Sequence, residues 1–227
     1  MKTVKNSKTL KSTAFLLAAA AWPALGQAAI VINEIDYDQP GSDTAEFIEI
    51  YNSGSASVSL DSFSIDLING NNGSSYRIID LTGFSINASG YFVICGDASQ
   101  VVNCDYSFTA SSSWLQNGAP DAVALLENDN IIDSLAYEGS LSPYTEGDAL
   151  DLADSNADIF SLSRLQDGID SDNNLLDFQQ GCITPGSANI AGIGDCSTPR
   201  VSAVPVPAAA WLFGSGIIGL AGFARRR

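Results

Sequence analysis

Short runs of alternating apolar and polar residues recur along the middle of the chain, separated by turns rich in Gly, Asn and Asp. A period of two predicts β-strands with one buried face. We expect strands at residues 30–36, 46–51, 58–67, 76–81, 91–95, 121–126, 131–137 and 159–165. The residues between 126 and 131 predict a four-residue hairpin loop, and 159–165 is expected to be the last strand. No amphipathic helix of three turns stands out, so the pattern predicts an all-β sandwich or barrel.

The first 28 residues have the pattern of a secretory signal peptide. Four lysines precede a short apolar run at 14–21, Pro23 breaks that run, and Gly26-Gln27-Ala28 offers small residues for cleavage. The run is short for a membrane span. An uncleaved anchor is the alternative.

The last 24 residues, 204–227, have three parts in a fixed order. A rigid extended element comes first, made of Val204, Pro205, Val206 and Pro207. Residues 208–224 carry no charge and would form a transmembrane helix about 26 Å long at 1.5 Å per residue. The chain ends with Arg225, Arg226 and Arg227, which the positive-inside rule keeps in the cytoplasm. The intervening domain, 29–200, would then lie outside.

This domain is strongly acidic. It holds all 26 acidic residues and three basic ones, a net charge of −23. Such a surface repels phosphate backbones, so we expect no nucleic-acid partner. The absence of His excludes His-based triads and His-ligated zinc. The acidity itself has two interpretations, cation binding or a solvated surface that keeps an exported protein soluble.

Two acidic clusters suggest a calcium site. One contains Asp36, Asp38, Asp43 and Glu46, and the other contains Asp167, Asp170, Asp172, Asn174 and Asp177. Oxygen ligands at alternate loop positions suit Ca²⁺. Residues 170–174 imitate the start of an EF-hand loop, but Leu175 replaces its Gly and Gly181 its Glu. The alternative is that these side chains cap turns. We therefore expect no obligate cofactor, with Ca²⁺ as the candidate ion.

The four cysteines predict disulfides in an exported chain. Nearness in sequence favours Cys95–Cys104 and Cys182–Cys196, while the other two pairings stay open. A zinc site is disfavoured by the spacings.

A carboxylate-based hydrolase is the enzymatic alternative, because two facing carboxyl groups suffice for glycoside hydrolysis. Glu34 and Glu49 are the candidates, as cross-strand neighbours. Solvent-facing strand glutamates explain them equally well, and we expect no enzyme. Arg164, within a predicted strand, is expected to pair with a carboxylate, and a recognition arginine is the alternative.

Three segments together resemble the lamin tail domain family in its exported bacterial form. They are INEIDYDQPGSDTAEFIEIYN at 32–52, ASGYFVICGD at 88–97, and SLSRLQDGIDSDNNLLDF with TPGSAN, which end at residue 189. The resemblance implies an immunoglobulin-like β-sandwich that serves as an interaction or display module. It implies no particular ligand. We expect residues 161–189 to supply the closing strand and a lid.

The tail resembles the PEP-CTERM sorting signals, in the variant named for its VPLPA motif. The resemblance implies processing by an exosortase-type protease after transient anchoring in the inner membrane, and display on the surface or in the matrix of a Gram-negative bacterium. Val206 stands where the commonest form has Glu, which leaves the sortase subtype open. A plain membrane anchor is the alternative, and would make the chain a permanently anchored, calcium-binding adhesion module. An extracellular polysaccharide or protein is the expected ligand.

Overall fold

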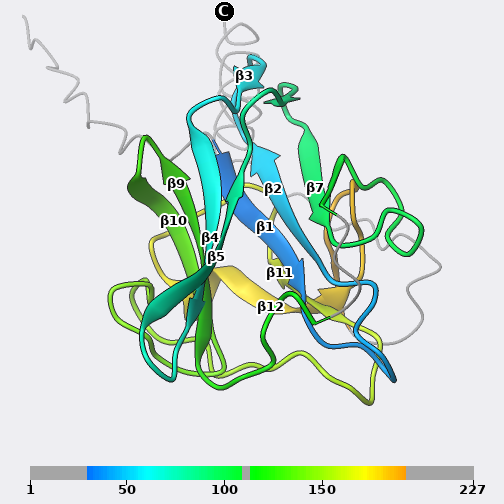
Figure 1. Cartoon of the computed structure of the whole chain (residues 1–227), viewed down its shortest axis with the longest axis vertical. Helices are drawn as coiled ribbons and strands as arrows, with labels where there is room; N and C mark the ends of the chain where they lie inside the picture. Colours follow the sequence, from blue (N-terminus) through cyan, green and yellow to red (C-terminus); the bar gives the residue numbers. More distant parts are fainter. Residues whose placement is uncertain (1–29, 109–112, 193–227) are drawn as a thin grey trace, which may run out of the picture.

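The computed structural model describes residues 30–108 and 113–192, and nearly all their regular structure is β (Figure 1). The larger of two main sheets has seven strands, in the order β13 (Ile190–Ala191), β12 (Phe178–Cys182), β11 (Ser161–Arg164), β1 (Ile30–Asp36), β2 (Phe47–Asn52), β7 (Tyr91–Cys95) and β8 (Tyr106–Ser107). The smaller sheet runs β10 (Asn130–Tyr137), β9 (Asp121–Glu127), β4 (Phe63–Asn69) and β5 (Ser74–Asp80). A short ribbon pairs β3 (Val58–Ser59) with β6 (Ser85–Ile86), and α1 (Asn174–Asp177) is a single turn.

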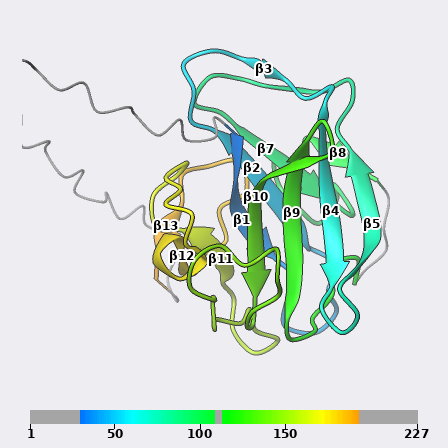
Figure 2. The ribbon, with the colours of Figure 1, turned by 90° about the vertical axis from the view of Figure 1, so that its left-hand side faces the viewer.

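The two main sheets pack face to face as a β-sandwich, with β10, β9, β4 and β5 in front of β1, β2 and β7 in Figure 2. Aliphatic side chains from both inner faces form one core, including Ile48 and Ile50 from β2, Ile65 from β4 and Val123 from β9. The expected period of two is therefore confirmed for β2, where Ile48 and Ile50 face the core.

The outer face of the seven-stranded sheet is also buried. Phe47 from β2 and Val93 from β7 belong to a second cluster on this face, with Val101 and the half-buried Ile183. Every residue of β1 is buried, whereas a sheet with one solvated face would expose alternate residues. A layer of loops therefore covers this face, and its polar side chains need partners inside the protein.

The hairpin between β9 and β10 is tighter than the sequence suggests. Its loop has two residues, because Glu127 pairs with Asn130, and the prediction of a four-residue loop is wrong. Asn128 and Asp129 adopt φ values of 50° and 61°, the left-handed conformation of a two-residue hairpin turn. Asn and Asp tolerate this conformation better than most residues.

The prediction that residues 159–165 form the last strand is also wrong, since β12 and β13 follow it. The residues of β12, Phe-Gln-Gln-Gly-Cys, show no alternation, so periodicity could not identify them. They form a strand because β11 already offers an edge, with Ser161 opposite Gly181 and Arg164 opposite Phe178.

The predicted signal peptide, sorting motif and transmembrane helix lie outside the described residues. Among residues 30–108 and 113–192, no helix has the length and apolar character needed to span a bilayer.

Candidate functional site

Two glutamates face each other on the covered side of the seven-stranded sheet. Glu34 of β1 is the register partner of Glu49 of β2, which confirms that they are cross-strand neighbours. Both are fully buried, so the alternative that they are solvent-facing strand residues is wrong. A buried carboxyl group is costly unless it is hydrogen-bonded or protonated.

A segment after β12, residues 184–189, supplies most of the hydrogen bonds to Glu34 and Glu49. The backbone N–H and Oγ1 of Thr184 donate to Glu34 at 2.9 and 2.8 Å, and the N–H of Gly186 donates to Glu49 at 2.7 Å. Asn189 donates to the carbonyl oxygens of Asn33 and Arg164. We call residues 184–189 the closing segment. The expected lid is thus present, and the two glutamates hold it in place.

Burial is the main cause of the raised pKa values of Glu34 and Glu49. Burial raises the pKa of Glu34 from 4.5 to about 7, against the hydrogen bonds from Ser161 and Thr184. Burial and the nearby Glu34 raise the pKa of Glu49 to about 9. At neutral pH, Glu49 is therefore protonated, and the pair carries at most about one negative charge.

Where β11 no longer pairs with β1, the side chain of Arg164 hydrogen-bonds to the β1 backbone. Strand β11 pairs with β1 only through residues 34 and 35, so the backbone of Ile32 needs other partners. The Ile32 carbonyl accepts from Arg164 Nε at 2.7 Å, and the Ile32 N–H donates to Asp133 at 2.6 Å. Arg164 also donates to both oxygens of Asp133, at 3.0 and 2.9 Å. The prediction that Arg164 pairs with a carboxylate is confirmed.

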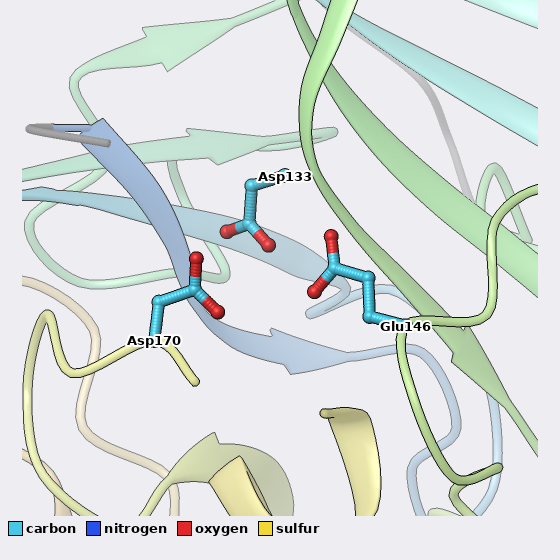
Figure 3. Close-up of side chains that lie close together, drawn as sticks. All are labelled: Asp133, Glu146 and Asp170. Carbon is cyan, nitrogen blue, oxygen red and sulfur yellow. The ribbon is translucent and has the colours of Figure 1, made fainter. Parts of the chain in front are cut away.

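Asp133 is also one corner of a carboxylate triad with Glu146 and Asp170, whose side chains converge in Figure 3. One oxygen from each lies within 4.8 Å of the others. Burial and the charges of Asp133 and Asp170 raise the pKa of Glu146 to about 8, and burial raises that of Asp133 to about 6 despite Arg164. The triad can hold a proton or a small cation beside the guanidinium group. Sequence reasoning identified only Asp170, because β10 and a distant loop supply the other two.

The carboxyl groups of the first predicted calcium cluster take part in hydrogen bonds within the fold. Asp36 is buried, and burial together with Asp154 raises its pKa well above the usual range. The two carboxyl groups share a hydrogen bond, so one of them is protonated. Asp43 accepts from the N–H of Gln39, and Asp38 lies beside both. Glu46, fully buried, accepts from two backbone N–H groups of the 113–115 segment.

The second predicted cluster is dispersed. Asp167 accepts from Asn33 Nδ2, from the Tyr91 hydroxyl at 2.8 Å and from the Asn189 N–H. Asp172 is exposed and adopts a φ of 54° at a turn. Asp177 pairs with Arg164, and Asn174 joins α1 to β10. Within the described residues, Asp170 is the one member of the two predicted clusters that belongs to a three-carboxylate group. Calcium binding by the predicted ligands stays a prediction, and the triad of Asp133, Glu146 and Asp170 is a separate candidate site.

The cysteine prediction is confirmed where the structure describes it. Cys95 and Cys104 form a disulfide with a Cα–Cα distance of 6.0 Å. Cys182 is also disulfide-bonded, and its predicted partner, Cys196, lies outside the described residues.

Comparison with known proteins agrees with this architecture. The profile of the Lamin Tail Domain family matches residues 23–139, which is just over half of the chain and includes all of β1 to β10. The first two resembling segments lie inside this match, and the third, at 161–189, lies outside it. No curated protein matches the chain. The match and the β-sandwich together show that the chain belongs to the lamin tail domain family.

Proposed function

We propose that this chain is a non-enzymatic interaction module of the cell exterior, exported by its signal peptide and processed at its C-terminal tail by an exosortase-type protease. The observation that carries the proposal is the Cys95–Cys104 disulfide. Disulfides of this kind form and persist in oxidising compartments outside the cytosol. The order of motif, apolar span and arginines at 204–227 supports the same route.

The use of the buried carboxyl groups supports a non-enzymatic role. Glu34 and Glu49 are fully buried and accept hydrogen bonds from the closing segment, so neither can reach a substrate in this state. Glycoside hydrolysis requires two carboxyl groups that flank an accessible bond. Lamin tail domains are non-catalytic immunoglobulin-like modules, which supports the same conclusion. The expected ligand is an extracellular polysaccharide or protein.

A motif swap tests the sorting step. Replacing Val204–Pro207 with Gly and Ser keeps the apolar span and the terminal arginines. We expect the altered protein to accumulate unprocessed in the inner membrane, while the unaltered chain reaches the surface or matrix. Equal release of both proteins would rule out motif recognition. Permanent retention of both would favour the plain anchor.

The triad of Asp133, Glu146 and Asp170 favours a second candidate function, calcium-dependent adhesion. A cation there would replace the proton that Glu146 retains at neutral pH. Calcium titration at pH 7 should then raise the melting temperature of the unaltered chain, and Glu146→Gln should abolish the rise. An unchanged melting temperature at millimolar calcium would eliminate this candidate.

A further inference from the structure

A polar hollow of about 340 Å³ lies beside the disulfide loop, lined by Tyr91, Asn103, Cys104, Asp105 and Gly186. It combines the first residue of β7, the loop that follows this strand and the closing segment. Neither the carboxylate triad nor the family match assigns a role to it. Tyr91 is half-buried, and Asn103 and Asp105 are exposed, so the hollow opens to solvent.

The walls of the hollow are fixed before any ligand arrives. Asp105 is tied to β7 twice, since its N–H donates to the Val93 carbonyl and its Oδ2 accepts from the Val93 N–H, both at 2.9 Å. The disulfide holds Cys104 against the same strand. Asn103 donates to the Pro185 carbonyl at 2.8 Å. Such preorganisation reduces the entropy lost on binding.

Three hydrogen-bond donors that line the hollow are already used. The Tyr91 hydroxyl donates to Asp167, the Gly186 N–H to Glu49 and the Asn103 amide to the closing segment. Within the described residues, Asp105 Oδ1 and the amide oxygen of Asn103 accept no hydrogen bond. Two acceptor oxygens and an aromatic ring therefore remain for a ligand, and a ligand with hydrogen-bond donors complements these oxygens.

The acidic side chains at the hollow favour a cation as its ligand. Asp105 lines the hollow, and Asp167 lies behind it through its hydrogen bond to the Tyr91 hydroxyl. The two arginines of the described residues are used elsewhere, because Arg164 is buried and Arg77 lies over Phe108. A cation near a tyrosine ring gains from the electron-rich face of that ring.

We propose that this hollow binds a primary alkylammonium group, presented as a lysine side chain by a partner protein. The compact ammonium supplies three donors for Asp105 and Asn103, while its four-carbon stem can lie on Tyr91. This inference rests on the proposed interaction function and gives that function a partner chemistry.

The test is a titration of the isotope-labelled full-length protein with Nα-acetyl-lysine methylamide, followed by amide chemical shifts. We expect saturable shifts at Asp105 and Gly186, and none with the Nε-acetylated probe, which has no charge. Asp105→Asn should weaken binding at least fivefold. Glu127→Gln, an exposed carboxylate on the other sheet, should leave the affinity unchanged.

Two substitutions of Tyr91 separate its ring from its hydroxyl. Tyr91→Phe should retain binding, and Tyr91→Leu should weaken it at least fivefold with unchanged shifts elsewhere. If Tyr91→Leu fails to fold, the Asp105→Asn comparison decides. If a free diamine bound more tightly than the lysine probe, the ligand would be a small amine and not a lysine side chain of a partner protein.

Absence of saturable shifts, equal response to the acetylated probe, or equal weakening by Asp105→Asn and Glu127→Gln would overturn the inference. These measurements use purified protein, so they do not depend on export or tail processing. Their failure is therefore distinguishable from failure of the proposed function.

Discussion

Buried carboxyl groups should make this protein less stable as the pH rises. The pKa of Glu49 moves from 4.5 to about 9 on folding, mainly through burial. Above pH 4.5, the folded state therefore retains a proton that the unfolded state releases. The free energy of unfolding then falls with rising pH until the folded pKa is passed.

The magnitude follows from one retained proton. One pH unit corresponds to 1.36 kcal/mol, so Glu49 alone should cost about 2 kcal/mol between pH 5.5 and pH 7. Glu34, with a folded pKa of about 7, lowers the free energy of unfolding further, and this contribution ends near pH 7. Asp154 and Glu146, with raised pKa values of about 7 and 8, act in the same direction. Urea unfolding of the full-length protein at pH 5.5, 6, 7 and 8, followed by near-ultraviolet circular dichroism, measures the slope.

Glu49→Gln isolates the contribution of this residue. Gln mimics the protonated acid and still accepts from the Gly186 N–H, but its amide N–H₂ group meets the Asn33 amide. The variant should therefore lose about 1 kcal/mol at pH 5.5. Its stability should fall less steeply, so that it equals or exceeds the unaltered protein at pH 8. Glu127→Gln, at an exposed position, is the control and should keep the original slope. Stability that is constant or increases from pH 5.5 to 8 would refute the reasoning.

Three further substitutions and one control test the ion pair, the disulfide and the packing. Arg164→Met should cost about 3–5 kcal/mol in urea unfolding, because it leaves buried carboxylates without their cation; a loss below 1 kcal/mol would contradict this role. Cys104→Ser should cost about 2–3 kcal/mol, from the short loop that the disulfide closes; unchanged stability under oxidising conditions would argue against it. Gly168→Ala should cost about 3 kcal/mol, since φ is +70° and a Cβ would lie 2.6 Å from the Tyr51 ring. Gly41→Ala, with open space around it, should cost about 1 kcal/mol, and equal losses would show that the clash does not matter.

Local patterns predicted most of the sandwich because its inner faces follow the period-two rule. The strands predicted at 30–36 and 91–95 are β1 and β7, with the same bounds. Turn chemistry was harder to predict, since Asn128 and Asp129 resemble ordinary loop residues until both adopt positive φ. Strand β12 was missed because its edge partner, not its own sequence, makes it a strand.

The candidate site was less predictable because its members come together only in three dimensions. Glu34 and Glu49 were correctly placed opposite each other, but sequence could not show that the closing segment covers them. The alternation alone suggested exposure. Asp133 is the one charged residue of β10, and this was the one local signal of a buried charge. Its partner Arg164 was expected to pair, but the identity of the carboxylate required the fold.

The intact mass of the mature protein, isolated from the surface or matrix of the producing cell, tests the central claim most directly. We predict a chain that lacks residues 1–28 and ends before Arg225, with the Cys95–Cys104 disulfide formed. A full-length chain of 23.7 kDa with reduced cysteines, recovered from the cytoplasm, would contradict the account.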